Sequence, residues 1–300
     1  MAFGFRFATW VACVAAVLGF SSGVQAQGTY PNRPIKLVAP FPPGGTSDVL
    51  SRVIAKKLGE ALGQPITVDN KPGASGNIGH DFVAKSPPDG YTIVISNSST
   101  FVSNPYLYKR MPFDPYNDFE SMGLVASAGQ VLIVHPSVPA RTVAELTALA
   151  KAKPGKLNFG TAGIGSMGHF AGELMKVSAG IDMRHVPYKG TAPANIDLIA
   201  NRVQAMFQNG PEAVAHIRAG SIKLLAVTGD KRSPQFPDTP TFIEAGVPGF
   251  VTYSWYGLSA PRGTPPAIVA TLNRQLNDIL SQPAINKRLT DLGLELRPVS

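Results

Sequence analysis

Two strand–turn–helix junctions constrain the fold of this chain more than any other feature of its sequence. In the first, an apolar strand at residues 35–39 runs through a turn rich in proline and glycine into an amphipathic helix. The second junction, at residues 157–166, repeats this design near the middle of the chain. A helix that begins at such a turn presents unpaired backbone N–H groups and the positive end of its dipole, and both favour an anion. Two junctions so far apart in sequence predict two lobes that close on one negatively charged ligand.

Short apolar runs alternate with amphipathic helical patterns, which indicates an α/β fold. We predict strands at residues 35–39, 66–69, 91–96, 131–135, 157–160, 203–207, 223–228 and 257–260. We predict helices at residues 142–153, 169–179, 192–201, 211–219 and 266–280, besides the helix that follows the first junction and ends at Gly63. Thr142, with Glu145 three residues later, forms a capping-box pattern at one helix start.

Two short passages, residues 126–130 and 251–256, are predicted to cross between lobes. They divide the chain into a first lobe of residues 27–127 and 252–300 and a second lobe of residues 128–251. Two crossings form a hinge, and hinged closure around a ligand is a known conformational change. The periodicity of the sequence alone does not fix this boundary.

The first 26 residues have the features of a cleavable export signal. Arg6 precedes an apolar stretch at residues 7–20 that is too short to span a bilayer, and Ala26 offers a small side chain at the cleavage position. The one cysteine of the chain, Cys13, lies inside this segment. The mature chain is therefore expected to be soluble and periplasmic, without a disulfide, a thiol nucleophile or a cysteine metal site.

The formal net charge of +8 favours negatively charged partners. The lysines and arginines are scattered, however, and no basic arm with interleaved aromatic residues is present. Together with the export signal, this pattern disfavours nucleic acid and favours small anions.

Several motifs, taken together and in order, resemble the Bug/TctC family, the substrate-binding proteins of tripartite tricarboxylate transporters. They lie at residues 30–35, 43–48, 70–79, 88–92, 159–166 with His169 and residues 172–174, 186–190, 237–241 with residues 244–246, and 255–257. No single motif is decisive, but the ordered set covers essentially the whole mature chain.

The resemblance implies a type II periplasmic binding protein with two lobes, a central cleft and two hinge crossings. Such receptors capture a small carboxylate between their lobes and deliver it to a membrane permease with one large and one small subunit. The chain is thus expected to be a monomeric solute receptor without a cofactor, rather than an enzyme. Two alternatives stay open: a receptor that feeds a membrane sensor, and an exported hydrolase that uses Ser166 as its nucleophile.

The candidate ligand-binding residues come from both junctions and from the loops that follow other predicted strands. They are Phe41, Pro43, Gly44, Gly45, Thr46, Ser47, Asn97, Ser98, Thr161, Ala162, Gly163, Ile164, Gly165, Ser166, Lys189 and Asn209. Backbone N–H groups at residues 162–165 are expected to hold one end of the ligand. Phe41 and Trp255 are candidate cleft walls, and Asp48 is expected to hold the first turn through backbone N–H groups. For each, a structural role as a helix cap, turn or core residue is the alternative.

Catalytic, nucleotide and metal sites find little support in the sequence. The turn at residues 44–46 lacks the lysine that ends a phosphate-binding P-loop. A Gly-x-Ser-x-Gly motif around Ser166 would need glycine where Ile164 stands, and the five histidines lack metal-ligand spacing. His169 is expected to pack or cap a helix.

Two positions depart from the family pattern. Members of the family often carry aspartate where this chain has Ala205 and Gln208. The second lobe is therefore expected to be less negative. A plain mono- or dicarboxylate is favoured over an amino acid, which would need a partner for its ammonium group.

Overall fold

The computed structural model describes residues 30–296 of the chain, so the predicted export signal and Cys13 lie outside the described residues. The strands are β1 (Ile35–Ala39), β2 (Ile66–Asn70), β3 (Thr92–Asn97), β4 (Phe119–Val134), β5 (Asn158–Thr161), β6 (Arg184–Pro187), β7 (Ala205–Asn209), β8 (Lys223–Val227), β9 (Tyr253–Pro261) and β10 (Glu295–Leu296). The α-helices are α2 (Thr46–Leu62), α3 (Asn77–Ala84), α4 (Asn104–Leu107), α5 (Val143–Ala152), α6 (Met167–Ala179), α7 (Thr191–Ile199), α8 (Gly210–Arg218), α9 (Pro266–Leu280) and α10 (Pro283–Asp291). A 3₁₀ turn at Ala74–Gly76 and a π-helical turn at Ser99–Ser103 complete the described elements. The α/β class predicted from the alternating pattern is confirmed.

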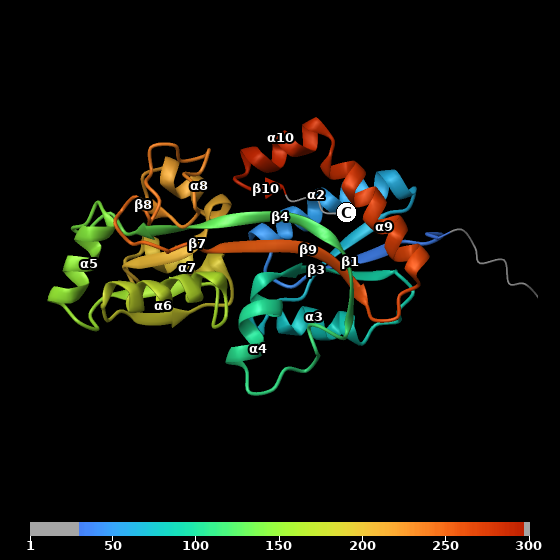
Figure 1. Ribbon diagram of the computed structural model, residues 1–300, viewed down its shortest axis with the longest axis horizontal. Coiled ribbons are helices and arrows are strands. Elements are labelled where there is room, and N and C mark those ends of the chain that lie inside the picture. The colour runs from blue at the N-terminus through green and yellow to red at the C-terminus, as the bar shows by residue number, and fades with distance from the viewer. Residues whose placement is uncertain (1–29, 297–300) are drawn as a thin grey trace, which may run out of the picture. The chain divides into compact units, whose positions relative to one another are not determined.

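The strands pair in two groups that share β4. Group A contains β2, β1, β3 and β9 in that order, followed by the first part of β4, to which β10 adds. Group B contains the last part of β4, with β7, β5 and β6 on one side and β8 on the other. Figure 1 shows β4, in green, running from group A into group B with β9 beside it.

Parallel pairing brings several strand ends to one edge of each group. In group A, β1 pairs in parallel with β2 and β3, and in group B, β5 pairs in parallel with β6 and β7. The helices α2, α6, α7 and α8 each follow the carboxyl end of one of these strands. In open α/β sheets ligands bind outside the carboxyl ends of the strands, so this edge is the place to look for a site.

The segments predicted as crossings fall in β4 and at the start of β9. Residues 126–130 belong to β4, and β9 begins at Tyr253, with Gly129 opposite Tyr253 and Ala126 opposite Tyr256. Beyond this pairing, β4 leaves β9 and pairs with β7 from Gln130 onward. The change of partner within one continuous strand joins the two groups.

Each group has its own apolar core. In group A, Leu37 and Ile93 on the sheet and Ile54 on α2 are fully buried. In group B, Phe159, Phe242 and Phe250 are buried together, and the rings of Phe242 and Phe250 stack with centroids 4.0 Å apart. Full burial of such side chains contributes about 1.5–3 kcal/mol each, which keeps each group rigid around the strand ends.

The sequence predictions place most elements correctly and differ at their ends. Strand β1 has the predicted bounds, and α5 begins after Thr142, whose side chain accepts a hydrogen bond from Glu145 N at 3.1 Å. The strand predicted at residues 131–135 is the end of the much longer β4. Strand β6 was not predicted, because its sequence Arg-His-Val-Pro has no apolar run and lies partly exposed.

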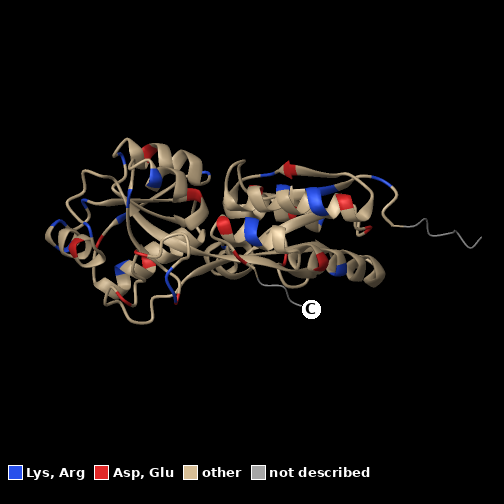
Figure 2. Cartoon of the chain, turned by 90° about the horizontal axis from the view of Figure 1, so that it is seen from above, with Lys and Arg blue, Asp and Glu red and all other residues tan. Residues whose placement is uncertain are grey.

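Charged residues show no concentration in one band. Lys and Arg lie over both strand groups and alternate with Asp and Glu (Figure 2). None of the helices among residues 30–296 combines the length and the apolar character that crossing a membrane requires.

Candidate functional site

One cavity lies at the carboxyl ends of β1, β3, β5, β6 and β7. Counted out to its open mouth and including solvent space, it holds about 620 Å³ of space free of protein atoms. The cavity is lined by Phe41, Pro42, Pro43, Gly45, Thr46, Ser47, Asn97, Ser98, Ser99, Gln130, Ala162, Ser166, Met167, Gly168, Gly190, Thr191, Ala192, Phe207, Gln208, Asn209, Glu212, Ser254 and Tyr256. Other hollows of the described chain have similar volumes, so volume alone does not identify a site.

Helix starts set this cavity apart. The first residues of α2, α6 and α7, and Glu212 in the first turn of α8, all lie on its wall. The first turn of a helix has N–H groups without an intrahelical acceptor, and the helix dipole places about half a positive charge there. The wall carries no lysine or arginine side chain. Its positive character therefore comes from backbone groups.

Buried polar atoms without a partner form the second distinguishing feature. Ser47 Oγ, Ser98 Oγ, Asn97 Nδ2 and both polar atoms of the Gln208 side chain are buried and have no hydrogen-bond partner among the described residues. All four residues are at most 3% exposed and lie on the cavity wall. A buried polar atom left unpaired costs about 1–3 kcal/mol, so these atoms indicate a place that a polar ligand fills.

Asp48 holds the first turn rather than the ligand, as predicted. Its Oδ2 accepts a hydrogen bond from Gly44 N at 3.0 Å and from Arg52 Nε at 3.0 Å, and its Oδ1 accepts from Asn70 Nδ2 at 2.9 Å. Burial by itself would raise the pKa of Asp48, but the hydrogen bonds from Arg52, Gly44 and Asn70 outweigh burial and hold the pKa below its usual value. Gly44 has a φ of 87°, which glycine adopts without strain.

Many of the predicted residues line the cavity and some do not. Those on the wall are Phe41, Pro43, Gly45, Thr46, Ser47, Asn97, Ser98, Ala162, Ser166 and Asn209. Those away from the wall are Gly44, Thr161, Gly163, Ile164, Gly165 and Lys189. Asn97 faces the cavity with its Nδ2 because its Oδ1 accepts hydrogen bonds from Thr100 N at 3.2 Å and Thr100 Oγ1 at 3.3 Å.

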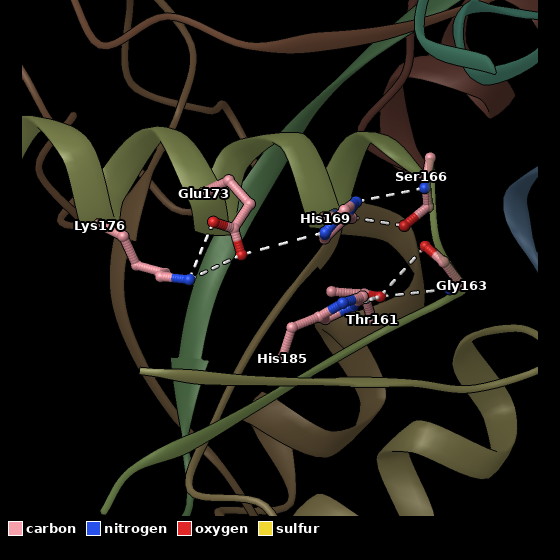
Figure 3. Close-up of polar contacts among 8 residues, drawn as sticks. Thr161, Gly163, Ser166, His169, Glu173, Lys176 and His185 are labelled. Atoms are coloured by element: carbon pink, nitrogen blue, oxygen red, sulfur yellow. Dashed lines mark hydrogen bonds and ion pairs between the residues drawn. The ribbon is translucent and has the colours of Figure 1, made fainter. Parts of the chain in front are cut away.

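Two of the backbone N–H groups at residues 162–165 that were expected to hold a ligand, those of Gly163 and Gly165, are engaged within the loop in this structure. Gly163 N donates to Thr161 Oγ1 at 3.2 Å, and Gly165 N donates to His169 Nδ1 at 3.2 Å (Figure 3). Thr161 is fully buried and its Oγ1 lies 2.6 Å from His185 Nε2, so its side chain supports the loop. These two N–H groups are therefore used for hydrogen bonds within the loop, and the first residues of α6 line the cavity.

Three further predictions are corrected by where the side chains lie. Ile164 and Lys189 line a neighbouring hollow together with Ser75 and Tyr108, and Lys189 is exposed. Trp255 lies outside the cavity and packs against Phe101, with ring centroids 5.7 Å apart. The cavity therefore has an apolar wall at Phe41 but no tryptophan and no lysine.

Several wall residues were not predicted, and the most important are Gln208 and Glu212. Burial raises the pKa of Glu212, and the hydrogen bonds from Thr46 offset only part of this effect. Glu212 brings an acidic side chain to the wall, which the expectation of a less negative second lobe did not include. The signal was present in the sequence, since a strand ending at Asn209 leads through Gly210 and Pro211 into a helix, like the two junctions that were recognised.

A polar network joins the two strand groups across the cavity. Glu212 Oε1, from group B, accepts hydrogen bonds from Thr46 N at 2.8 Å and Thr46 Oγ1 at 2.9 Å, both from α2 beside group A. Asn209 Nδ2 donates to Thr46 Oγ1 at 3.1 Å and to Tyr256 OH at 2.7 Å. Gln130 Nε2 donates to Asn209 Oδ1 and to Ser254 Oγ.

Ser166 caps a helix and has no base beside it. Its Oγ accepts a hydrogen bond from His169 N at 3.2 Å, while the imidazole of His169 accepts from Gly165 N instead. Among residues 30–296, no three His, Cys, Asp or Glu side chains gather in a way that suits a metal ion.

The histidines that support the second loop predict an acid-sensitive fold. His169 and His185 stack with ring centroids 4.1 Å apart (Figure 3). Burial, followed by the charge of His169, lowers the pKa of His185 to about 4, and burial lowers the pKa of His80 to about 4. In the unfolded chain these side chains take up protons near pH 6.5, so between about pH 6.5 and 4 the unfolded state binds more protons. The free energy of unfolding is therefore expected to fall as the pH drops through this window.

Urea denaturation at pH 7 and pH 5 measures this effect. In the His185→Gln variant, unfolding at pH 5 is expected to take up about one proton fewer than in the unchanged protein, because one titrating group is gone. The His216→Gln variant, on the outer part of α8, serves as the control. An identical pH slope in the His185→Gln variant and the unchanged protein would contradict the assignment.

The comparisons with known proteins place the chain in one family. Residues 50–299 match the family model described as tripartite tricarboxylate transporter family receptor, TctC. The protein BugT of Bordetella pertussis is 39% identical over 271 residues, which cover 90% of this chain and 83% of BugT.

Two solved structures are similar over nearly their whole length. The structure of an R. palustris protein with adipate has a TM-score of 0.88 and 40% identity and covers 90% of this chain and 91% of that one. MatC from Rhodopseudomonas palustris with bound malate has a TM-score of 0.84 and 34% identity and covers 89% of this chain and 91% of MatC. The fold is that of the periplasmic binding proteins, and the chain belongs to the TctC family of tripartite tricarboxylate transporter receptors, which bind solutes and are not enzymes.

Proposed function

We propose that this receptor captures a small organic carboxylate in the cavity and delivers it to the permease subunits of a tripartite tricarboxylate transporter. The family to which it belongs supports transport, and two similar proteins have been solved with adipate and with malate. Residues 1–26 would direct export to the periplasm, where the receptor would act as a monomer.

The observation that carries the proposal is the combination of helix starts with unpaired buried donors. Ser47 Oγ and Ser98 Oγ can each donate one hydrogen bond, and Asn97 Nδ2 can donate as well. These atoms share one wall with the first residues of α2 and α6. Hydrogen bonds from such groups to a carboxylate are charge-assisted and about twice as strong as neutral ones, so the wall suits a carboxylate better than a neutral solute.

The two strand groups would act as the lobes of a clamp. Residues 27–127 and 252–300 would form the first lobe and residues 128–251 the second, with the crossings in β4 and at the start of β9. A ligand that contacts Ser98 of the first lobe and Gln208 of the second gains contacts only when the lobes are closed. This difference in affinity between open and closed forms is what drives closure.

A thermal-shift screen tests the proposed ligand class. Mono-, di- and tricarboxylates, aromatic acids, amino acids, sugars and divalent cations are each added to the mature protein. A carboxylate present at about 100 times its dissociation constant is expected to add about 2.7 kcal/mol of stability, which corresponds to a rise in Tm of about 5–10 °C. A panel in which only a sugar or a cation raises the Tm would contradict the proposal.

A further inference from the structure

The side chain of Glu212 occupies the position at the start of α2 where a ligand carboxylate was expected. Thr46, the first residue of α2, donates two hydrogen bonds to Glu212 Oε1. The backbone N–H and the hydroxyl of Thr46 are therefore already used by the protein's own carboxyl group. A ligand carboxylate has to take other donors of the wall, such as Ser47 Oγ and Ser98 Oγ, which are unpaired.

The second oxygen of Glu212 has no partner. Its Oε2 is buried and makes no hydrogen bond with any described residue. Asn209 Nδ2 uses its two hydrogens on Thr46 Oγ1 and Tyr256 OH, and the hydroxyl of Thr191, which also interacts with the Glu212 carboxyl group, leaves Oε2 unpaired. A donor that comes with the ligand would complete this acceptor.

No basic side chain shares the wall with Glu212. The groups that face the cavity from α2, α6, α7 and β9 include Ser47, Ser166, Thr191 and Tyr256, which are uncharged, and the helix starts supply the positive potential. Two carboxylates that meet without a cation or donor between them repel each other. A ligand that carries a donor beside its carboxylate removes this repulsion and satisfies Oε2 in one step.

We propose that Glu212 makes this receptor selective for carboxylates that carry a hydrogen-bond donor, a hydroxyl or an ammonium group, next to a carboxylate. The inference rests on the proposed function and names the ligand class within it. Gln208 supports the same class, because its unpaired Oε1 is a second acceptor on the wall, and the side chain is only 2% exposed.

Matched ligand sets in calorimetric titrations at pH 7.5 test the proposal. Each set has one chain length, chosen from the acid with the largest shift in the thermal screen. At four carbons the set is succinate, malate and aspartate, and at six carbons it is adipate, 2-hydroxyadipate and 2-aminoadipate. The unchanged protein is expected to bind the hydroxy or the amino acid at least about tenfold more tightly than the plain acid, because hydrogen bonds to charged groups contribute that much or more. Preference for the hydroxy acid identifies a hydroxyl as the donor, and preference for the amino acid identifies an ammonium group.

The Glu212→Gln variant keeps the shape of the side chain and removes its charge, so it tests the carboxylate alone. Gln keeps an oxygen for Thr46 but turns the other atom into a donor, so the preference is expected to vanish or to reverse towards the plain acid. Glu60→Gln removes an exposed carboxylate from the far end of α2 and is expected to keep the preference.

Three results would overturn the inference. The first is that the plain acid binds the unchanged protein as tightly as the hydroxy and amino acids. The second is that the preference survives in Glu212→Gln. The third is that the plain acid binds more tightly at pH 5 than at pH 7.5 and takes up a proton on binding, and that Glu212→Gln abolishes this uptake. Glu212 would then be protonated and would donate a hydrogen bond to the ligand. Absence of binding by every carboxylate would instead contradict the proposed function, so the two failures are distinguishable.

Discussion

Replacing Gln208 by leucine is expected to weaken carboxylate binding about 100-fold and to raise the Tm of the ligand-free receptor. The side chain of Gln208 is 2% exposed, lies on the cavity wall, and has no partner for either polar atom. In the ligand-free protein these atoms cost stability, and leucine of similar size removes that cost. With ligand bound, the same atoms become hydrogen-bond partners, so leucine removes affinity. The receptor thus gives up stability at this position in favour of binding.

Thermal unfolding without ligand and calorimetry with ligand measure the two opposite effects on the same sample. The gain in stability is expected to be about 1 kcal/mol, equivalent to about 2–4 °C in Tm, because water in the cavity compensates part of the original cost. Gln275→Leu, at a partly buried position on α9 outside the cavity, is the matched control and should leave the affinity unchanged. A Gln208→Leu protein that binds its ligand like the unchanged receptor would remove Gln208 from the site.

Replacing Asp48 by alanine is expected to lower the free energy of unfolding by about 2–3 kcal/mol and to weaken ligand binding. Asp48 is 4% exposed and holds the first turn through Gly44 N, Arg52 and Asn70. Without the carboxylate, buried donors of the turn lose their acceptor, and the start of α2 is no longer fixed at the cavity. Urea denaturation measures the stability and calorimetry measures the affinity.

The pH dependence of the same variant gives an independent check. The pKa of Asp48 in the folded protein lies below its ordinary value. Its contribution to stability is therefore complete above the ordinary pKa of about 3.9 and is lost as the pH falls through the lower folded value. Asp291→Ala breaks an exposed ion pair with Lys287 and is expected to cost at most about 0.5 kcal/mol. If Asp48→Ala lowers the free energy of unfolding by no more than Asp291→Ala does, the Asp48 carboxylate does not stabilise the turn.

Local signals explain why much of the fold could be predicted from the sequence. Strand β1 is apolar except for Lys36, and α2 ends at Gly63, which takes the left-handed conformation with a φ of 67°. The turn of the first junction is held by near contacts such as Gly44–Asp48 and Asp48–Asn70, and its wall residues from Phe41 to Ser47 were predicted except for Pro42. Strand β6 and the full length of β4 were missed because pairing with distant strands, rather than local composition, makes them strands.

The second junction shows where local reasoning fails. The sequence at Gly163 and Gly165 is that of an open anion-binding loop, yet both N–H groups are engaged within it. The acceptors are Thr161 Oγ1 and the ring of His169, and the ring of His185 packs against both. His185 reaches the loop only because β6 pairs with β5, a contact that periodicity cannot supply.

Glu212 and Gln208 were missed for a different reason. The strand–turn–helix pattern at the end of β7 is present in the sequence, but the absence of aspartates at positions 205 and 208 points only to a less negative second lobe. Which side chains of β7 and α8 reach the cavity depends on where β7 ends and on the first turn of α8. Neither can be fixed when the strand boundary is uncertain by two residues, as it was here.

Calorimetric titration of one carboxylate and its methyl ester tests the central claim most directly. The ligand is the acid that gives the largest thermal shift, and the ester removes the charge of the carboxylate while adding one methyl group. The account predicts that the acid binds and that the ester binds at least about 100-fold more weakly, because the unpaired donors and helix starts of the wall act on the carboxylate charge. Equal affinities for acid and ester would contradict the claim that these groups form a carboxylate site.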